Sequence, residues 1–388
     1  MRAGLLPESR HTRRRPRFTR GLVVTSVAAA AALVLAACGG TTGSTTTSSS
    51  SSDSGSSSSG GSASGESSSG GPSTGASTDK PLVYGVFATP LEEPWDGAVH
   101  QALQAAADAG EIVYKHTDNN DSDDKMTRTL TDLLTNEKPA IVFGDAFSSE
   151  DAIRAVAKDY PKVQFAFGSG NDPVDPNFST FDNWLQDPAY LAGMLAGGVT
   201  KSNTIGVVAA MPIPEVDRIV NAFIKGVAET NSKATVKVTF INSFFDPTTA
   251  KQAALAQVAQ GADVLFAERD GVIEAAKEKN LPVIGMMVDQ KSQAPKNVMT
   301  SLVWNMRPTV EEVLKEFKAG TLHSQNLGQY SYMKNGGSSL APINTDIPGG
   351  IPQALIDKVT AKQKAIMDGT FTTPIDEKAP GGSTTVGQ

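Results

Sequence analysis

The 388-residue sequence has a single cysteine, Cys38, so no internal disulfide bond can form. Histidine is scarce as well, and only His100, His116 and His323 lie beyond the N-terminal segment. None of the three belongs to a His-Glu-x-x-His pattern, and the part expected to fold has neither a Gly-x-Ser-x-Gly motif nor a Walker phosphate loop. These absences favour a protein that is not an enzyme, and we expect neither a cofactor nor a metal.

A basic surface is also missing from most of the chain. The formal net charge is −7 at pH 7, and seven arginines are concentrated in residues 1–20. Nucleic-acid-binding domains carry a cluster or stripe of positive charge that neutralises phosphates. We therefore do not expect nucleic acid as a partner.

The first 37 residues have the organisation of an export signal. An arginine-rich start is followed by the apolar run 21–37, which is too short for a comfortable membrane span. The run ends in Leu35-Ala36-Ala37-Cys38, which resembles a bacterial lipobox. The resemblance implies cleavage before Cys38 and attachment of diacylglycerol to it, and hence a protein anchored on the extracytoplasmic face of the cell membrane. An arginine triplet leaves twin-arginine export open as an alternative to the general route.

Low-complexity composition limits the part of the chain that can fold. Residues 38–79 are nearly all Ser, Gly and Thr, which offer too little apolar surface to offset the entropy of folding. We expect a disordered tether there and a disordered tail at 378–388. About 300 residues remain, which is more than one hydrophobic core usually takes, so two lobes are expected.

Apolar runs of strand length alternate with amphipathic helical patterns along the remaining chain. The expected strands are 82–88, 112–116, 140–144, 163–168, 204–210, 236–241, 264–267, 283–287, 298–303 and 329–333. The expected helices include 124–135, 150–160, 190–199, 214–229 and 248–261. Asp187-Pro188 and Asp246-Pro247 each pair a capping residue with a proline suited to the first helical turn. The alternation predicts an α/β fold in which parallel sheets are flanked by helices, with a ligand between the lobes.

Residues 81–110 show this pattern most clearly, as a strand, a loop and a helix that begins at Pro94. The loop after a strand's carboxyl end is where open α/β sheets bind ligands. Here the chain places Trp95 beside Asp96, an aromatic face next to a carboxylate, which suits a planar, nitrogen-rich ligand. The alternative is that Trp95 caps the core while Asp96 complements the helix N-terminus.

Further polar and aromatic clusters follow other expected strands. These candidate ligand-binding residues are Ser169, Gly170, Asn171, Phe244, Phe245, Glu268, Arg269, Asp270, Asp289 and Trp304. Each cluster alone is compatible with an ordinary loop. Because the carboxyl ends of parallel strands share one edge of a sheet, their joint placement favours a common cleft. Two aromatic rings from opposite lobes could enclose a planar ligand, each adding about 1 kcal/mol beyond area burial.

Two other motifs suggest binding sites only at first sight. The acidic run 118–124 lacks the glycine and the glutamate that a calcium loop requires at its sixth and twelfth positions, so we interpret it as a solvated loop and helix cap. Gly168-Ser169-Gly170 follows a strand, but Pro173 stands where a dinucleotide fingerprint needs its third glycine. We expect a turn there.

Four motifs stand out along the chain: PWDGA at 94–98, MPIPEV at 211–216, NSFFDP at 242–247 and TSLVWN at 300–305. Together with the lipobox, they resemble the basic membrane protein family, whose members are substrate-binding lipoproteins of ABC importers and include purine nucleoside receptors. The resemblance implies a two-lobe type I periplasmic-binding fold with three hinge crossovers. It places lobe 1 at 80–185 plus 288–325 and lobe 2 at 186–287 plus 326–377, and implies a monomer that works with ABC permease subunits.

The resemblance also assigns roles within the cleft. Trp95-Asp96 matches an aromatic-polar pair of nucleoside-binding members, and Phe244, or else Phe245, matches their second aromatic residue. Two sugar-binding charges of those receptors are replaced here, by Met287 and Trp304. The implied ligand is a purine base or nucleoside, and the replacements argue against ribose. A sugar ligand, and a sensing role without transport, remain alternatives.

Overall fold

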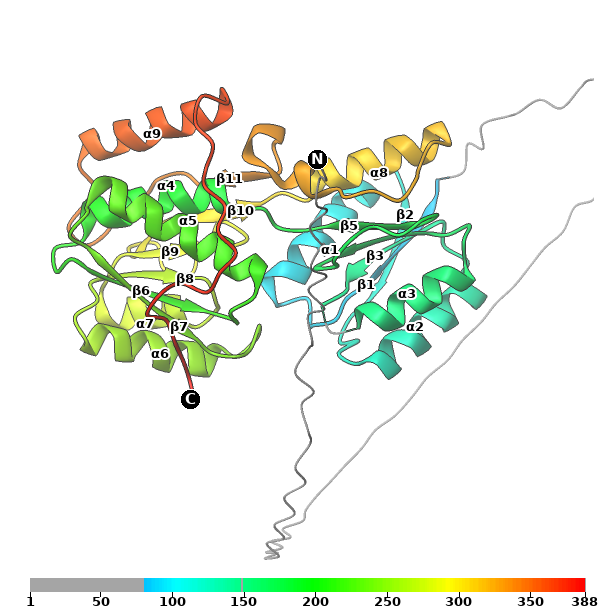
Figure 1. The fold of residues 1–388 in the computed structure, drawn as a ribbon, viewed down its shortest axis with the longest axis horizontal. Helices are drawn as coiled ribbons and strands as arrows, with labels where there is room; N and C mark the ends of the chain where they lie inside the picture. Colours follow the sequence, from blue (N-terminus) through cyan, green and yellow to red (C-terminus); the bar gives the residue numbers. More distant parts are fainter. Residues whose placement is uncertain (1–79, 148, 388) are drawn as a thin grey trace, which may run out of the picture. The chain divides into compact units, whose positions relative to one another are not determined.

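The computed structural model describes residues 80–147 and 149–387, all within the compact unit Thr74–Gln388 (Figure 1). The expected signal peptide, the lipidated Cys38 and the tether lie outside the described residues. The described chain forms two sheets, each flanked by helices on both faces. No helix among these residues is both long enough and apolar enough to cross a bilayer.

The first sheet has five strands in the order β2-β1-β3-β4-β5, and every neighbouring pair is parallel. Its strands are β1 Leu82–Val86, β2 Val113–Thr117, β3 Ile141–Asp145, β4 Gln164–Gly168 and β5 Phe178–Phe181. Its helices are α1 Pro94–Asp108, α2 Asp123–Asn136, α3 Glu150–Asp159 and the later α8 Arg307–Ala319. Figure 1 shows α1 and α8 on one face of this sheet and α2 and α3 on the other.

The second sheet has seven strands in the order β11-β10-β9-β8-β6-β7-β12. Its strands are β6 Thr204–Ala209, β7 Thr235–Phe240, β8 Val264–Ala267, β9 Val283–Gly285, β10 Val298–Trp304, β11 Ser338–Leu340 and β12 Thr384–Thr385. Its helices are α4 Gln186–Val199, α5 Pro214–Thr230, α6 Pro247–Ala259, α7 Val272–Lys279 and α9 Gln353–Met367, with short 3-10 turns at Gly328–Ser331 and Met333–Asn335. In Figure 1, α4, α5 and α9 lie on one face and α6 and α7 on the other.

The chain passes between the two lobes three times. The crossings follow β5, β10 and α8, and the first and third lie side by side through a bridge between Thr180 and Asn326. One cluster of buried apolar residues continues across this junction and includes Trp95, Phe181 and Trp304. The α/β fold with three crossovers is thus confirmed, and the crossovers are packed rather than free linkers.

Local sequence signals explain where the site-bearing helices begin. Pro94 occupies the first turn of α1, where the missing N–H costs nothing, and the Glu93 carboxylate caps the helix by accepting from the backbone N–H groups of Trp95 and Asp96. The expected cap at Asp246 is confirmed, since its side chain accepts from Thr249 N. Each cap fixes a polar loop at the end of a strand.

Several local predictions were wrong. The expected strand 329–333 forms 3-10 turns, because its N–H groups bond back to nearby carbonyls, as Tyr332 N does to Gln329 O. The run 298–303, expected in lobe 1, pairs with β9 in the second sheet. Helix α4 begins at Gln186, before the expected cap at Asp187. Strand β5 was not predicted, and part of the expected disordered tail forms β12 beside β7.

Candidate ligand-binding cleft

A cavity of about 480 Å³ lies between the carboxyl ends of the first sheet and the second lobe; we call it the main cavity. Its lining residues are Ala88, Thr89, Pro90, Glu93, Trp95, Asn119, Asp121, Asp145, Phe147, Ser169, Glu215, Ser243, Phe244 and Phe245. The lining residues from Ala88 to Ser169 lie at or beyond the carboxyl ends of β1, β2, β3 and β4, whereas the last four come from α5 and the loop after β7. The cavity is therefore built by both lobes, at the edge where the fold predicts a ligand.

Aromatic rings from the two lobes meet at this cavity. Phe147, which follows β3, contacts Phe244, which follows β7, with ring centroids 4.7 Å apart and planes at 70°. Phe245 also lines the cavity but is 41% exposed. The two candidate phenylalanines therefore differ, because Phe244 is half-buried against a ring of the opposite lobe and Phe245 is more exposed.

Trp95 lines the main cavity with only a small part of its surface. The ring stacks on Phe181 with centroids 5.7 Å apart and lies 4.9 Å from the ring centroid of Trp304. It also fills the space beside Gly168, where an added Cβ would lie 2.0 Å from the indole. Trp95 is 5% exposed, so the geometry favours the alternative that this residue caps the core.

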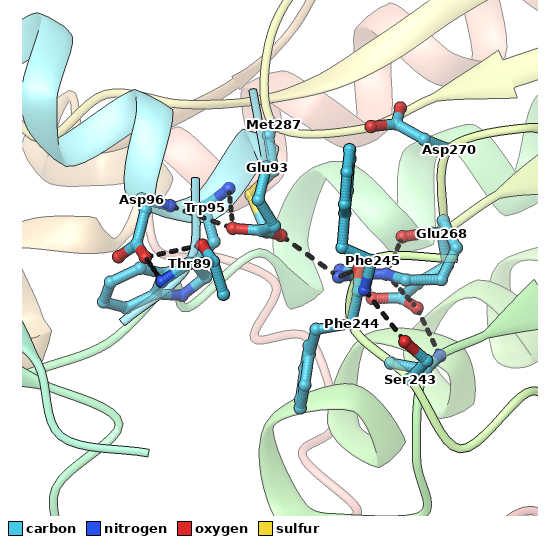
Figure 2. A network of polar contacts seen from close by, with 12 residues as sticks. Thr89, Glu93, Trp95, Asp96, Ser243, Phe244, Phe245, Glu268, Asp270 and Met287 are labelled. Atoms are coloured by element: carbon cyan, nitrogen blue, oxygen red, sulfur yellow. Dashed lines mark hydrogen bonds and ion pairs between the residues drawn. The ribbon is translucent and has the colours of Figure 1, made fainter. Parts of the chain in front are cut away.

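Asp96 is fully buried behind the cavity rather than lining it. One carboxylate oxygen, Oδ2, accepts from the backbone N–H of Thr89 at 2.9 Å and from its hydroxyl at 2.6 Å (Figure 2). The other oxygen, Oδ1, has no hydrogen-bond partner among the described residues. Burial, and then the nearby Asp145 and Glu93, raise the pKa of Asp96 well above its usual value. Asp96 thus holds the Thr89 loop in place.

Two carboxylates line the main cavity without an ion-pair partner among the described residues: Asp145 at the end of β3 and Glu215 in the first turn of α5. Asp145 accepts from Phe147 N, yet burial raises its pKa to about 7. Burial, and then the charge of Asp182, raise the pKa of Glu215 to about 8. Glu215 Oε1 is buried without a hydrogen-bond partner among the described residues.

Other acidic side chains of the cleft are paired. Arg269, at the end of β8, bonds Glu93 of the first lobe at 3.2 Å and the neighbouring Glu268 at 2.8 Å, and donates to the carbonyl of Phe244 (Figure 2). All three charged groups are almost completely buried. Burial alone would lower the pKa of Arg269, but the attraction of Glu268 and Glu93 outweighs it and raises that pKa. The ion pair joins the lobes within the described chain.

A smaller hollow of about 330 Å³ adjoins the main cavity and shares Phe147, Ser169 and Glu215 with it; we call it the side cavity. The predicted site residues Gly170 and Asn171 line it. Asn171, however, donates from its side-chain and backbone nitrogens to Glu150. The remaining lining residues are Thr180, Phe181, Asp182, Trp184, Ile213, Pro214, Arg218, Asn326 and Glu377.

The opposite end of the cleft is filled. Asp270, Met287 and Gln290 surround, with Glu268, Arg269 and their neighbours, a hollow of only about 10 Å³; we call it the closed corner. Asp270 accepts from the Gln290 side chain at 3.3 Å. Trp304 is buried and donates to Ser331 Oγ, and Asp289 is exposed and bonds Lys291 N. Neither Asp289 nor Trp304 lines the three hollows described.

The cleft contains residues that sequence reasoning missed, notably Glu93, Asp145, Phe147 and Glu215. Asp145 and Phe147 stand directly at the end of a buried strand, which is the same signal that identified Glu268. Glu215 lies inside the motif MPIPEV but was not assigned a role. The acidic run after β2 forms a loop, and α2 begins within it at Asp123. Among the described residues, no group of three or more His, Cys, Asp or Glu side chains could hold a metal ion.

Comparison with known proteins then decides the family. The model of a family described as ABC transporter substrate-binding protein PnrA-like (Bmp) matches residues 89–334, more than half of the chain. The chain belongs to this family. The description that this family carries is that of a substrate-binding protein of an ABC transporter.

Relatives within the Bmp family carry different ligand names. The chain is 32% identical over 232 residues to a Haloferax volcanii protein named as an ABC transporter glucose-binding protein, TsgA13, covering 59% of this chain and 57% of that one. It is 29% identical over 240 residues to a purine-binding protein of Brucella abortus, covering 61% and 67%. The chain thus spans between 57% and 67% of the lengths of these two relatives.

A solved solute-binding protein of an ABC transporter system from Aeropyrum pernix shares the fold. It superposes with a TM-score of 0.64 at 19% identity, over 76% of this chain and 94% of that one. At such low identity the likeness concerns the fold alone. It agrees with the two-lobe arrangement seen in Figure 1.

Proposed function

We propose that this protein is a lipid-anchored receptor of an ABC importer that captures a small planar ligand, with a purine base as the preferred class. The observation that carries the proposal is the lining of the main cavity. It combines Phe147 and Phe244 from opposite lobes with four acidic side chains, and the described lining residues include no lysine or arginine. Such a lining favours a ring that donates hydrogen bonds and disfavours an anion.

The filled end of the cleft supports a base over a nucleoside. Ribose would need hydrogen-bonding partners in a pocket next to the ring, yet the closed corner around Met287 has room for about 10 Å³ only. Trp304, in place of a sugar-binding lysine, packs against Trp95 instead of facing a hollow. The main and side cavities, by contrast, have room for a ring.

A sugar is the second candidate, because one relative is named as a glucose-binding protein. Aromatic rings also stack on sugar faces, and carboxylates such as Asp145 and Glu215 accept bonds from hydroxyl groups. Neither of two further observations distinguishes a purine from a sugar. One relative is named as a purine-binding protein and another as a glucose-binding protein, and a lining without a described cationic side chain suits both ligands. A direct binding comparison distinguishes them.

The decisive experiment is a thermal-shift screen of the purified chain with purine bases, nucleosides, pyrimidines and common sugars. A ligand that binds only the folded state raises the melting temperature by mass action. We expect adenine, guanine or hypoxanthine to give larger shifts than their nucleosides. A larger shift with nucleosides would contradict the preference for a base, and a shift with sugars alone would establish the second candidate.

Membrane attachment and coupling to a permease are separate parts of the proposal. Replacing Cys38 with alanine should move the protein from the membrane fraction to the soluble extracytoplasmic fraction, because the lipid attachment site is lost. Retention of the Cys38→Ala variant in washed membranes would contradict the anchor. Loss of ligand uptake in cells lacking the gene would favour transport over sensing, whereas unchanged uptake with a lost transcriptional response would favour sensing.

A further inference from the structure

Among the four carboxyl groups that line the main cavity, those of Asp145 and Glu215 have no ion-pair partner in the described part of the chain, whereas Glu93 pairs with Arg269 and Asp121 with Lys125. Asp145 and Glu215 come from opposite lobes and line the same cavity. Glu215 is 7% exposed, and its Oε1 atom has no hydrogen-bond partner among the described residues. A buried acceptor without a donor is unfavourable, so a ligand that supplies N–H groups from within the cavity would complete the site.

The aromatic rings next to these carboxylates restrict how a ligand can meet them. Phe147 lines both cavities beside Glu215, and Phe244 contacts it from the second lobe. A planar ring that packs against such side chains presents its hydrogen-bonding groups at its edge. A carboxylate has two acceptor oxygens, so it is complementary to an edge with two parallel N–H donors.

We propose that Asp145 and Glu215 are specificity-determining residues that recognise the edge of the ring and select heterocycles with two adjacent N–H donors, as in a 2-amino-6-oxopurine. The inference deepens the proposed function, on which it rests, by naming the hydrogen-bonding pattern of the ligand. A ring with an acceptor at the same edge would meet a carboxylate oxygen instead of a donor, and would bind less tightly. Both lobes contribute to the recognition, so the preferred ring also links them.

The charged groups around the two carboxylates support a preference for donors. Asp145 is faced by the carboxylates of Glu93, Asp96 and Asp182, besides the hydroxyl of Ser169. Burial contributes most to the raised pKa of Glu215, and the negative charges of Asp182 and Glu268 raise that pKa further. The cationic groups that oppose this effect on Glu215 are Arg218 and Arg269, and each is engaged with other carboxylates.

These surroundings give the preference a pH dependence. Donors bind best to the ionised carboxylates, and burial raises the pKa of Asp145 to about 7 and of Glu215 to about 8. Ionisation of both groups therefore increases as the pH rises through this range. Affinity for a two-donor edge should increase in the same direction, whereas affinity for an edge with one donor and one acceptor should decrease.

The test compares guanine with hypoxanthine, which differ only in the 2-amino group beside N1–H. Equilibrium dialysis of the full chain with each radiolabelled base should give about tenfold tighter binding of guanine near pH 8, equivalent to about 1.4 kcal/mol. Asp145→Asn and Glu215→Gln should each reduce this ratio to about threefold or less, because an amide has only one acceptor oxygen. Glu278→Gln on the exposed face of α7 is the matched control and should leave both affinities unchanged.

The outcomes separate the inference from the proposed function. Equal binding of the two bases, or an unchanged ratio in both variants, overturns the donor-edge inference while the purine receptor stands. Binding of sugars but of neither base overturns the proposed function itself. If a variant binds the bases too weakly to measure, adenine binding to the unmodified protein is the second measurement. The affinity for adenine should decrease as the pH rises from about 6 to about 8.5. An increase over this range would contradict the inference.

Discussion

The two ends of the cleft use the same kind of side chain in opposite ways. At the closed corner, Glu268 is paired with Arg269, which also bonds Glu93 in the wall of the main cavity, and little space remains. At the main cavity, Asp145 and Glu215 are also buried, but they have no ion-pair partner among the described residues. The buried charges of Glu93 and Glu268 are therefore compensated internally, whereas those of Asp145 and Glu215 are left for a ligand.

This difference separates residues that stabilise the protein from residues that bind. Trp95 and Trp304 looked like binding residues in the sequence, yet their contacts lie mainly with each other and with Phe181. Phe147 was not noticed in the sequence, yet it is the ring that meets Phe244 across the cavity. Substitutions at the packed end should mainly change stability, and substitutions at the open end should mainly change affinity.

The largest effect is expected for Arg269→Met, which would leave two buried carboxylates, Glu93 and Glu268, without their partner. Breaking a buried ion pair from one side typically costs about 3–5 kcal/mol. Chemical denaturation should show this loss in the free energy of unfolding. The control Arg269→Lys keeps a positive charge and should lose less, and a loss below about 1 kcal/mol in the methionine variant would mean that the ion pair does not join the lobes as described.

Trp95→Ala should have the next largest effect, again on stability. Removing an aromatic side chain that is 5% exposed and stacked on Phe181 leaves a void next to Gly168. Truncating a buried aromatic side chain typically costs about 3–5 kcal/mol of the free energy of unfolding. Because one edge of this ring lines the cavity and packs against fewer atoms, we expect a loss near the lower end of that range. Thermal unfolding would detect the change. A variant with native stability but weaker ligand binding would restore the direct stacking role predicted from the sequence.

Phe244→Ala should act on affinity instead. The ring lines the main cavity and is only partly buried, so its removal should weaken binding of a purine base about tenfold, near 1.4 kcal/mol, with a smaller effect on stability. Phe245→Ala is the matched control, because that ring is 41% exposed and should matter less. Calorimetric titration of both variants decides between them, and a greater effect at Phe245 would reverse our assignment.

The Asp145→Asn variant should alter how stability depends on pH. Burial raises the pKa of Asp145 from 3.8 to about 7 in the folded state, so the folded protein binds more protons than the unfolded chain between these values. Stability of the ligand-free protein should therefore fall as the pH rises from about 4 through about 7. The variant should melt at least about 2 °C above the unmodified protein near pH 8, and at a similar temperature near pH 4. An identical pH profile would argue that Asp145 titrates normally.

Asp289→Asn should have the smallest effect of all. The side chain is exposed, bonds only the nearby Lys291 N among the described residues, and lines none of the three hollows. Surface substitutions of this kind usually change stability by less than about 0.5 kcal/mol. Ligand affinity should also stay within about twofold of the original. A larger loss of affinity would show that the cleft extends to Asp289 when ligand is bound.

Local sequence signals were sufficient for most of the framework. The period of apolar residues predicted most of the sheet strands but not β5, β11 or β12, and Pro94 and the Asp246 cap marked the starts of α1 and α6. They failed where the outcome depends on distant partners. Strand β5 is recognisable only from its pairing with β4, and the run 298–303 belongs to the second sheet because β9 and β11 accept it there.

The sequence by itself determined the family, the alternation of strands and helices, and the edge of the sheets where the cleft lies, because these follow from motifs and short-range periodicity. Only the tertiary structure decided which polar residues are paired and which are left for a ligand. Glu93 and Arg269 are 176 positions apart, and Asp145 and Glu215 come from different lobes. Whether a buried charge is compensated depends on what the fold brings next to it, and no local pattern contains that information.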